Sequence, residues 1–570
     1  MKNRILCLLL AMLMIVSAML FTVSCKDDTP DCPGDTPGGT VTPPGGGGGG
    51  GDEVVDYPWD TTSLFFQMTD NSNNNDLSSG CRRYLAGVSD DNANVDDMID
   101  TRNAKAKLAT KTEIVYDYWE ESGSVHTWSK DIAEIVELTK TAASTAAPDM
   151  YCTYVYDMVG AMLQGCFCNI LADLRGTNYF RFLETGEDGY NPKVDDEGYM
   201  YEYMTSVTLS AKKMYLVASD YFTDLIRAFF VVPVNMKLLT ENATAVTGDQ
   251  DKDGDSDFDD LVAIVERGEW NYELLMQYCE AVVQENTQTG KVDLGGRVGF
   301  ALDAYSGLAS SGMVYTTNII IINRVGDDLT DYKYSYPETN LELVTFAENI
   351  ADLASTRGVY VVPSNKQGLN NIRDAFATNH VLFGGVVCVG SLEDDIYQNM
   401  RDQDGFGVVP VPLYRTVNPE TGEPDEYLTQ IHNVGRAGAI AKNTTKFDVC
   451  TAYLNYLSLN STDILNEYYD WTLSMGAAAG TSSANGNVKM LQYIRSHVRS
   501  SFDKVFEDAL GIYSSELTPG DLWHKVIQSG YNQADAYMLG SGFASIYKKL
   551  YEVKARALVT LRKAFEEFQD

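Results

Sequence analysis

The stretch of this sequence with the most evident chemistry is an acidic run with seven aspartates between positions 249 and 260. Oxygen ligands at alternate positions of a short loop are what a hard divalent cation needs. Gly254 stands at the sixth position, where such a loop must turn sharply. Carboxylates so close together would repel one another without a cation. We therefore predict a structural calcium site, with Asp255 contributing its backbone carbonyl, whose ligands are Asp249, Asp251, Asp253, Asp255, Asp257 and Asp260.

This acidic run resembles the calcium loops of EF-hands and dockerins. Asp260 at the twelfth position matches the dockerin version of the loop, whereas EF-hands have Glu there. Ser256 occupies the eighth position, which is normally apolar. One such loop is visible, and dockerins need a pair to bind a partner, so the resemblance implies a structural staple in an insertion at 247–266. The alternative is a solvated acidic loop that holds no cation.

Polar and aromatic side chains follow several predicted strands, at the ends where two-lobed α/β proteins bind ligands. Aromatic faces stack on the C–H faces of sugars, and carboxylates and amides bind sugar hydroxyl groups, so this pattern predicts a carbohydrate cleft. The candidate ligand-binding residues selected in this way are Asp70, Asn71, Trp119, Tyr154, Tyr156, Tyr305 and Ser391. The alternative for each aromatic residue is core packing, because the chain contains 35 Tyr and 21 Phe. Trp270 is assigned to packing at the start of a helix.

The motifs of common enzyme classes are missing from the sequence. It contains no G-x-S-x-G, H-E-x-x-H or G-x-x-x-x-G-K-[ST] string. Its five histidines have no spacing suited to a metal site or a catalytic triad. Carboxylates are too numerous for one pair to stand out as the acid and base of a glycosidase. We therefore expect no enzyme and name no catalytic residue; an extracellular glycoside-acting enzyme is the less favoured alternative.

The elements that must position these residues alternate between strands and helices. The first part reads as strand 63–68, helix 94–110, strand 113–119, helix 130–145, strand 150–155 and helix 159–174. Further strands are predicted at 297–303, 380–389, 405–412 and 437–441, and further helices at 270–283, 341–356 and 446–459. This alternation is typical of an α/β sheet with right-handed crossovers. The fold class is therefore α/β, with discontinuous lobes and a mainly helical C-terminal part that closes with a helix at 543–569.

The N-terminal residues have the layout of an export signal followed by a tether. A basic head and an uncharged apolar stretch at 5–20 precede small residues and a cysteine. The ending TVSC resembles the lipobox of bacterial lipoproteins, which implies a signal peptide at 1–25 and lipid attachment at Cys25. Residues 26–56, rich in Gly, Pro and Thr, read as a flexible linker. The alternative is an ordinary cleaved signal with a chance cysteine.

Composition limits the partners of the globular part, which is long enough for two or more lobes with full cores. The formal net charge is -37, so the surface repels phosphate backbones and nucleic-acid binding is not expected. Beyond 5–20 there is no uncharged apolar stretch of membrane-spanning length, so we expect the lipid to be the sole membrane attachment. The cysteines after Cys25 are scattered, many of them in apolar runs, and are expected to be buried thiols.

Several segments resemble those of extracellular solute-binding proteins of ABC importers, of the family 1 kind that often handles sugars. The likeness covers nearly all of 64–570, and its segments are VDDMIDTRNAKAKLATKTEIVYDYW, PDMYCTYVYDMVGAMLQG, KKMYLVASDYFTDLIRAFFVVPVNMKLLTE, RGEWNYELLMQYCEAVVQ, NIRDAFATNHVLFGGVVCVGSL, GFGVVPVPLYR and NVGRAGAIAKNTTKFDVCTAYLNYLS. The resemblance implies a periplasmic-binding-protein-like (type II) fold, in which two lobes joined by crossing strands close on a ligand. It also implies that Trp471, in NEYYDWTLS, lies near the cleft.

These observations together predict a substrate-binding lipoprotein. Its solute-binding domain, 57–570, captures a small solute, a sugar or oligosaccharide being favoured, and delivers it to the transmembrane subunits of an ABC permease. We expect a monomer held by its lipid at the outer face of the cytoplasmic membrane of a Gram-positive bacterium. The alternative is a surface glycan-capture or adhesion module without a transporter.

Overall fold

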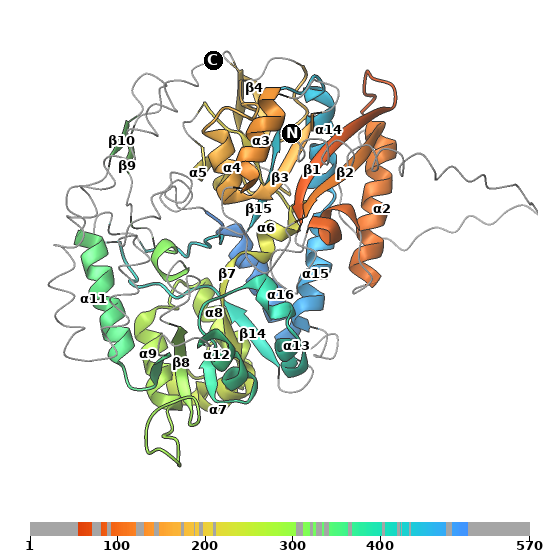
Figure 1. Cartoon of the computed structure of the whole chain (residues 1–570). Helices are drawn as coiled ribbons and strands as arrows, with labels where there is room; N and C mark the ends of the chain where they lie inside the picture. The colour runs from red at the N-terminus through yellow and green to blue at the C-terminus, as the bar shows by residue number, and fades with distance from the viewer. Residues whose placement is uncertain are drawn as a thin grey trace, which may run out of the picture. The chain divides into compact units, whose positions relative to one another are not determined.

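The protein is represented by a computed structural model (Figure 1), and all described residues belong to one compact unit that begins at Val55. The described ranges are 55–70, 81–87, 93–120, 130–141, 147–172, 176–186, 189–192, 198–208, 212–303, 312–317, 319, 323–325, 333–335, 341–362, 368–401, 405–418, 422, 424–432, 435–474 and 482–499. Cys25, Asn71, Tyr305, residues 26–54 of the linker and the predicted helix at 543–569 lie outside them. Within the described ranges, every helix is too short or too polar to cross a membrane.

The first sheet has the strand order β2-β1-β3-β15-β6. Its strands are β1 Thr62–Asp70, β2 Thr112–Glu120, β3 Met150–Tyr154, β6 Leu216–Val217 and β15 Arg436–Ile440. Strands β1, β2 and β3 are parallel, so their carboxyl ends meet at one edge, whereas β15 runs antiparallel to β3 and β6. The predicted strands of this part are confirmed, and the sheet combines an early stretch of the chain with a late one.

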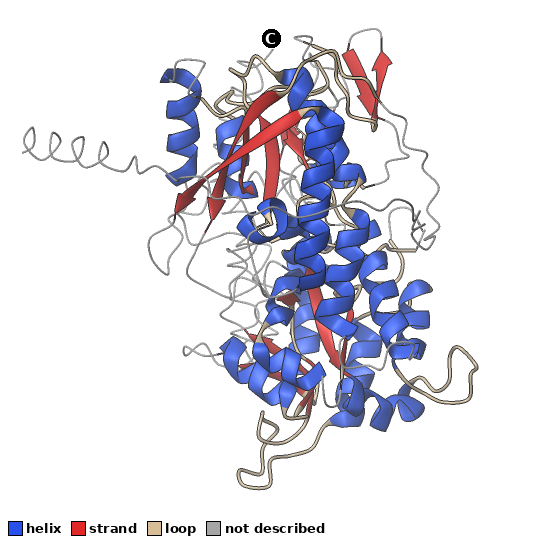
Figure 2. Ribbon diagram, turned by 90° about the vertical axis from the view of Figure 1, so that its right-hand side faces the viewer, coloured by secondary structure: helices blue, strands red, loops and turns tan. Residues whose placement is uncertain are grey.

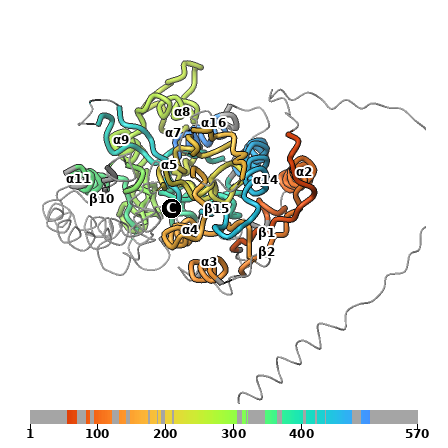
Figure 3. The backbone as a smooth tube through the Cα atoms, turned by 90° about the horizontal axis from the view of Figure 1, so that it is seen from above, coloured from red at the N-terminus to blue at the C-terminus, as the bar shows by residue number. Residues whose placement is uncertain are grey.

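Helices cover both faces of the first sheet. The remaining elements of this lobe are the π-helix η2 Cys81–Ala86, α2 Ala93–Thr110, α3 Lys130–Thr141, α4 Val155–Met162, β4 Leu183–Gly186, β5 Gly189–Pro192, α5 Tyr201–Ser206 and α14 Phe447–Leu459. Figure 3 shows α3 and α4 on one side of the sheet and α2 and α14 on the other, and each pair packs together.

The predicted helix at 159–174 is wrong in both of its bounds. Helix α4 begins directly after β3 and ends at Met162. Gly165, with φ +71°, then turns the chain in a conformation that disfavours side chains. The turn brings Cys168 back to the sheet, where its N–H donates to the carbonyl of Ile440 at 2.9 Å. The apolar residues after Gly165 are therefore buried at the sheet and not in a helix, a difference that apolar content alone could not indicate.

The second sheet has the order β11-β8-β12-β7-β13, with β14 also paired to β7. Its strands are β7 Phe230–Asn235, β8 Val298–Asp303, β11 Val359–Val362, β12 Val381–Phe383, β13 Val387–Cys388 and β14 Phe406–Val409. Strands β11 and β12 run parallel to β8, and β7 is antiparallel to β12, β13 and β14. The single strand predicted at 380–389 is two strands, because Gly385 has φ +79° and breaks the run.

Helices of the second part pack around this sheet, and β9 and β10 form a separate two-stranded sheet. Their bounds are α7 Met236–Val246, α8 Phe258–Glu266, α9 Tyr272–Val282, β9 Asn323–Val325, β10 Lys333–Ser335, α11 Leu341–Ser355, α12 Gly368–Ala377, η3 Val389–Glu393 and α13 Asp395–Arg401. Helix α9 starts two residues after Trp270, because the Asn271 side chain accepts the N–H of Leu274 at 2.9 Å and caps it. Trp270 is fully buried and donates its indole N–H to the carbonyl of Pro410.

The chain passes between the two sheets three times, and this makes the fold two-lobed with discontinuous lobes. The first crossing runs from β6 through α6, Thr223–Arg227, to β7. The second leads from β14 to β15. The third follows α14 and continues in α15 Thr462–Ser474 and α16 Ser482–Ser496, and α16 packs on β14 and α8. Figure 2 shows the two groups of strands in red, with helices running past both.

The described cysteine side chains agree with the expectation of buried thiols. Cys152, Cys166, Cys168, Cys279, Cys388 and Cys450 are all buried. Burial raises the pKa of the Cys279 and Cys450 thiols well above the usual range, so both remain protonated and unreactive near neutral pH.

Candidate functional site

The carboxyl edge of the first sheet carries several of the predicted ligand-binding residues. Asp70 and Trp119 lie at the ends of the neighbouring strands β1 and β2, and the register pairs Thr69 with Trp119. Trp119 is half-buried, and its ring stacks on Tyr151 of β3 with centroids 6.2 Å apart. Asp70 and Trp119 are therefore brought together at one edge, as the strand-end rule expects.

Tyr154 ends β3 and faces inward. Its side chain is buried, its hydroxyl accepts a hydrogen bond from Arg436 at 3.1 Å, and the Arg436 guanidinium lies 4.5 Å from the ring centroid. These contacts match core packing, the alternative stated for each aromatic candidate. Tyr156 is half-buried in the first turn of α4. Only Tyr156 of this pair has surface left for a ligand to contact.

Ser391 and Trp471 belong to elements outside the first sheet. Ser391 is half-buried in η3, and its carbonyl accepts the N–H of Asp394 at 3.4 Å. Trp471 is half-buried in α15, with the Arg83 guanidinium 5.3 Å from its ring centroid. Arg83 belongs to the π-helix η2, which follows β1 in the chain. Strand-end reasoning missed Arg83; π-helical turns occur often at functional sites, but the sequence carries no signal for one.

A buried network of charges lies between α6, η3, β15 and α15, and we call it the junction network. Its members are Asp224, Arg227, Glu393, Arg436 and Tyr468. The Asp224 carboxylate binds Arg436 on one side and Arg227, at 2.7 Å, on the other. Arg227 donates two hydrogen bonds to Glu393, at 2.7 and 3.1 Å, and the Tyr468 hydroxyl donates to Glu393 at 2.6 Å.

The junction network is electrically balanced, with two guanidinium groups and two carboxylates. Its groups are almost fully buried, the most exposed being the Glu393 side chain at 14%. Burial, and next the Glu393 carboxylate, raise the pKa of Tyr468 well above the usual tyrosine range, so its hydroxyl stays protonated and can donate. Because every charge has a partner within the network, these contacts suit a joint between lobes better than a site for a charged ligand.

A second buried ion pair joins the first and third crossings. Asp220, which follows β6, accepts hydrogen bonds from Arg495 of α16 at 2.6 Å and from Thr462 of α15 at 2.7 Å. Burial raises the pKa of Asp220, while Arg495 and Thr462 oppose that shift. Directional charged contacts thus hold the crossing segments together. Surfaces of the two lobes that lie outside the crossings are not held by these contacts.

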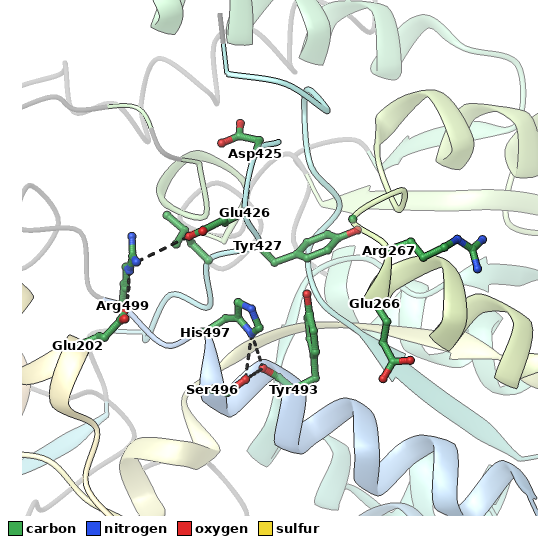
Figure 4. Close-up of a pocket in the computed structure, with 12 residues that line it drawn as sticks. Glu202, Glu266, Arg267, Asp425, Glu426, Tyr427, Tyr493, Ser496, His497 and Arg499 are labelled. Carbon is green, nitrogen blue, oxygen red and sulfur yellow. Dashed lines mark hydrogen bonds and ion pairs between the residues drawn. The ribbon is translucent and has the colours of Figure 1, made fainter. Parts of the chain in front are cut away.

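An open groove near the third crossing has a volume of about 380 Å³ (Figure 4). The rings of Tyr493 and His497 stack in it with centroids 4.2 Å apart. Arg499 forms ion pairs there with Glu202 at 2.6 Å and with Glu426 at 3.7 Å. None of the ligand-binding residues predicted from the sequence lines this groove. Its size alone does not connect it with solute binding.

The predicted calcium loop is an exposed turn before α8. Carboxylate oxygens of Asp249, Asp251 and Asp253 lie within 4.8 Å of one another, which fits a hard cation. Asp257 and Asp260 instead form a capping box at the start of α8. The Asp260 carboxylate is buried and accepts backbone N–H groups, among them that of Asp257 at 2.8 Å. Three of the six predicted ligands therefore converge, and the last two would have to be shared with the helix cap.

Charge repulsion is visible within the loop. The neighbouring carboxylates of Asp253 and Asp257 raise the pKa of the exposed Asp255. Burial, followed by Asp259 and Asp260, raises the pKa of Asp257. The sharp turn is made by Gly254, with φ +108°, whose N–H donates to Asp249 at 3.1 Å.

Comparison with known proteins finds similarity only among solved structures. No family model and no curated protein sequence match the chain. The GacH receptor of Streptomyces glaucescens is 13% identical, with 86% of this chain and 99% of that chain covered and a TM-score of 0.44. The extracellular solute-binding protein family 1 from Alicyclobacillus acidocaldarius is 10% identical, with 87% and 100% covered and a TM-score of 0.46.

A third similar structure is the maltose/maltodextrin-binding domain from Bdellovibrio bacteriovorus, bound to maltotriose. It is 10% identical, with 89% of this chain and 100% of that chain covered and a TM-score of 0.43. Sequence identities and TM-scores this low give no argument about function. The function of this chain is therefore inferred from its own topology and side chains.

The junction network yields a stability prediction. The substitution Asp224→Asn removes the carboxylate shared by Arg227 and Arg436, and breaking a buried charge pair in this way costs about 3–5 kcal/mol. Urea denaturation should show this loss as a lower midpoint. Glu241→Gln is the control, because the Glu241–Arg297 pair is largely exposed and should contribute little. Equal midpoints for the two variants would contradict the assigned role of the network.

Proposed function

We propose that this protein captures a small solute between its two lobes. The observation that carries the proposal is the threefold passage of the chain between two α/β lobes. Lobes joined by a few crossing segments can rotate as nearly rigid bodies and close around a ligand. The junction network and the Asp220–Arg495 pair hold the crossings together, so that motion is confined to the joint. A ligand buried on closure contacts both lobes and stabilises the closed form.

The solute we propose is a carbohydrate. Trp119 at the carboxyl edge and Trp471 in α15 both keep part of their ring surface exposed, and aromatic faces stack on sugar rings. Asp70 ends the strand beside β2 and would add a carboxylate for hydroxyl groups. The balanced charge of the junction network agrees with an uncharged solute.

Delivery of the solute to the transmembrane subunits of an ABC permease completes the proposal. The TVSC ending of the signal would give a mature protein that starts at a lipidated Cys25 and is held at the outer face of the membrane. The linker at 26–56 would span roughly 30 Å as a flexible coil and at most about 100 Å when extended. That reach suits a receptor that must both search for solute and turn to dock on a permease in the same membrane.

We also propose that the acidic loop before α8 holds a structural Ca²⁺. The three converging carboxylates, Asp249, Asp251 and Asp253, support this, as does the repulsion that raises the pKa of Asp255. A bound cation would relieve that repulsion and order the loop. The carbonyl of Asp255 and the side chains of Asp257 and Asp260 are the other proposed ligands.

Solute binding is tested by thermal-shift measurements over a panel of sugars, peptides and polyamines. A sugar that binds the native state should raise the melting temperature, and the rise should continue to grow as the sugar concentration exceeds the dissociation constant. Trp119→Ala should weaken binding of that sugar about fivefold, since an aromatic contact of this kind contributes about 1 kcal/mol. Trp59→Ala is the matched control, because Trp59 precedes β1 and packs at the opposite end of the sheet. If no solute shifts the melting temperature at millimolar concentration, the receptor proposal fails.

Lipid attachment is tested with Cys25→Ser in the natural host or a related bacterium. The wild-type protein should fractionate with the membrane and incorporate labelled fatty acid, and the variant should do neither. Membrane association of the variant without label would show that an uncleaved signal, not a lipid, anchors the chain.

Calcium binding is tested by adding EDTA and then Ca²⁺ while unfolding is followed. EDTA should lower the melting temperature and excess Ca²⁺ should restore it, whereas the double variant Asp251→Asn/Asp253→Asn should respond to neither.

The Ca²⁺ affinity of the loop should also depend on pH. Burial raises the pKa of Asp257, whose side chain is a proposed ligand, so protons compete with the cation there and the Ca²⁺ affinity should fall as the pH falls towards that pKa. An unchanged melting curve would instead support the alternative that the loop is a solvated turn without a bound cation.

A further inference from the structure

Asp131, in the first turn of α3, is a buried carboxyl group that the proposed function has not yet used. One of its oxygens, Oδ2, accepts a hydrogen bond from the Thr69 hydroxyl and another from the Thr153 hydroxyl, each 2.5 Å long. All three side chains have no solvent exposure. Thr69 belongs to β1 and Thr153 to β3, so the carboxyl group bridges two neighbouring strands.

The bridge lies where the backbone ladder between these strands stops. The ladder joins β1 to β3 from the pair Phe66 and Met150 to the pair Met68 and Cys152. Thr69 and Thr153 are the next residues towards the carboxyl edge. Beyond the last backbone pair, the two strands are therefore connected through the hydrogen bonds of the Asp131 side chain.

One of the residues that follow is a proposed solute contact, and the other is packed against Arg436 beside the same edge. Asp70 comes directly after Thr69, and Tyr154 directly after Thr153. A shift of either threonine would move its neighbour by a similar amount. The Asp131 bridge thus fixes the relative position of the two strand ends from which the proposed edge is built.

Helix α3 is itself held firmly, so that Asp131 cannot follow the strands if they move. Ile132 packs directly on Gly160 of α4, where a Cβ atom would lie 2.3 Å from the Cδ1 atom of Ile132. On the side of α3 that carries Asp131, Ile135 is also buried. The helix therefore offers a fixed point to which both strands are attached.

The other oxygen of the carboxyl group, Oδ1, is buried and has no hydrogen-bond partner among the residues that the structure describes. A buried acceptor without a donor is costly, and an apolar residue would pack at such a place without that cost. Asp149 provides the contrast at the amino end of the same ladder. Its carboxylate accepts hydrogen bonds from the N–H of Phe65 at 3.0 Å, Thr444 at 2.6 Å and Lys446 at 3.0 Å.

We propose that Asp131 is a positioning residue of the solute-binding edge, which it holds in shape by tying Thr69 to Thr153. This inference rests on the proposed function, because it takes the carboxyl edge of the first sheet as the place where solute binds. It assigns to Asp131 an effect on affinity that Asp149, at the opposite end of the same two strands, does not have.

The test compares Asp131→Ala with Asp149→Ala in the full-length protein. Amide hydrogen exchange should become faster at 68–70 and 152–156 in Asp131→Ala, and faster at the amino ends of the strands in Asp149→Ala. Titration calorimetry with maltotriose as the first probe, followed by the sugar that stabilises the wild type most, measures affinity. Asp131→Ala should weaken binding about tenfold and Asp149→Ala less than about twofold, although both lose stability.

The pair Thr153→Val and Thr153→Ser covers the case in which Asp131→Ala does not fold. Valine keeps the shape of threonine without its hydroxyl, and should weaken sugar binding about threefold or more, whereas serine keeps the hydroxyl and should restore the affinity. Equal sugar affinity in Asp131→Ala and Asp149→Ala, or in Thr153→Val and the wild type, would overturn the proposal. If the wild type binds no sugar, the carbohydrate function fails instead, and unchanged exchange at 68–70 would show independently that Asp131 ties nothing.

Discussion

The two-lobed arrangement depends on a small set of charges that are removed from water where the chain crosses between its sheets. Asp224 accepts hydrogen bonds from Arg436 of the first sheet and from Arg227 of the first crossing. Arg227 also donates to Glu393, beside the second sheet. Each of these charges would be expensive to bury alone, so the network persists only when all of its members are in place. This mutual dependence keeps the crossing segments paired with one another, which apolar contacts of similar area would do with less directional preference.

A neutral, fully paired joint has a consequence for binding. Its charges are paired with one another, so the solute recognition that we propose would come from groups at the edges of the lobes. At the carboxyl edge of the first sheet, Trp119 presents a partly exposed ring supported by Tyr151, and Asp131 ties the ends of β1 and β3. In the proposed site, Tyr151 and Asp131 thus form a rigid support, and Trp119 is a contact held by it. Binding geometry is usually maintained in this way.

Much of the fold could be predicted from the sequence because local patterns determine local structure. Strands β1, β2, β3, β8 and β15 and helices α3, α9, α11 and α14 lie within a few residues of their predicted places. The errors have local causes that apolar content does not reveal. Gly165 diverts the chain after α4, and Gly385 divides a buried run into β12 and β13. Both glycines adopt positive φ values, which depend on what the following residues pack against.

The sequence by itself determined the alternation of strands and helices, the acidic loop and the aromatic residues at strand ends, and it predicts the export signal, because each depends on residues close together in the chain. Only the tertiary structure decided which strand ends share an edge, that Tyr154 lies under Arg436, and that Asp131 reaches Thr69 and Thr153. It likewise placed Asp224 beside Arg436, 212 positions away in sequence. Contacts over such separations follow from the packing of whole elements, and no local pattern encodes them.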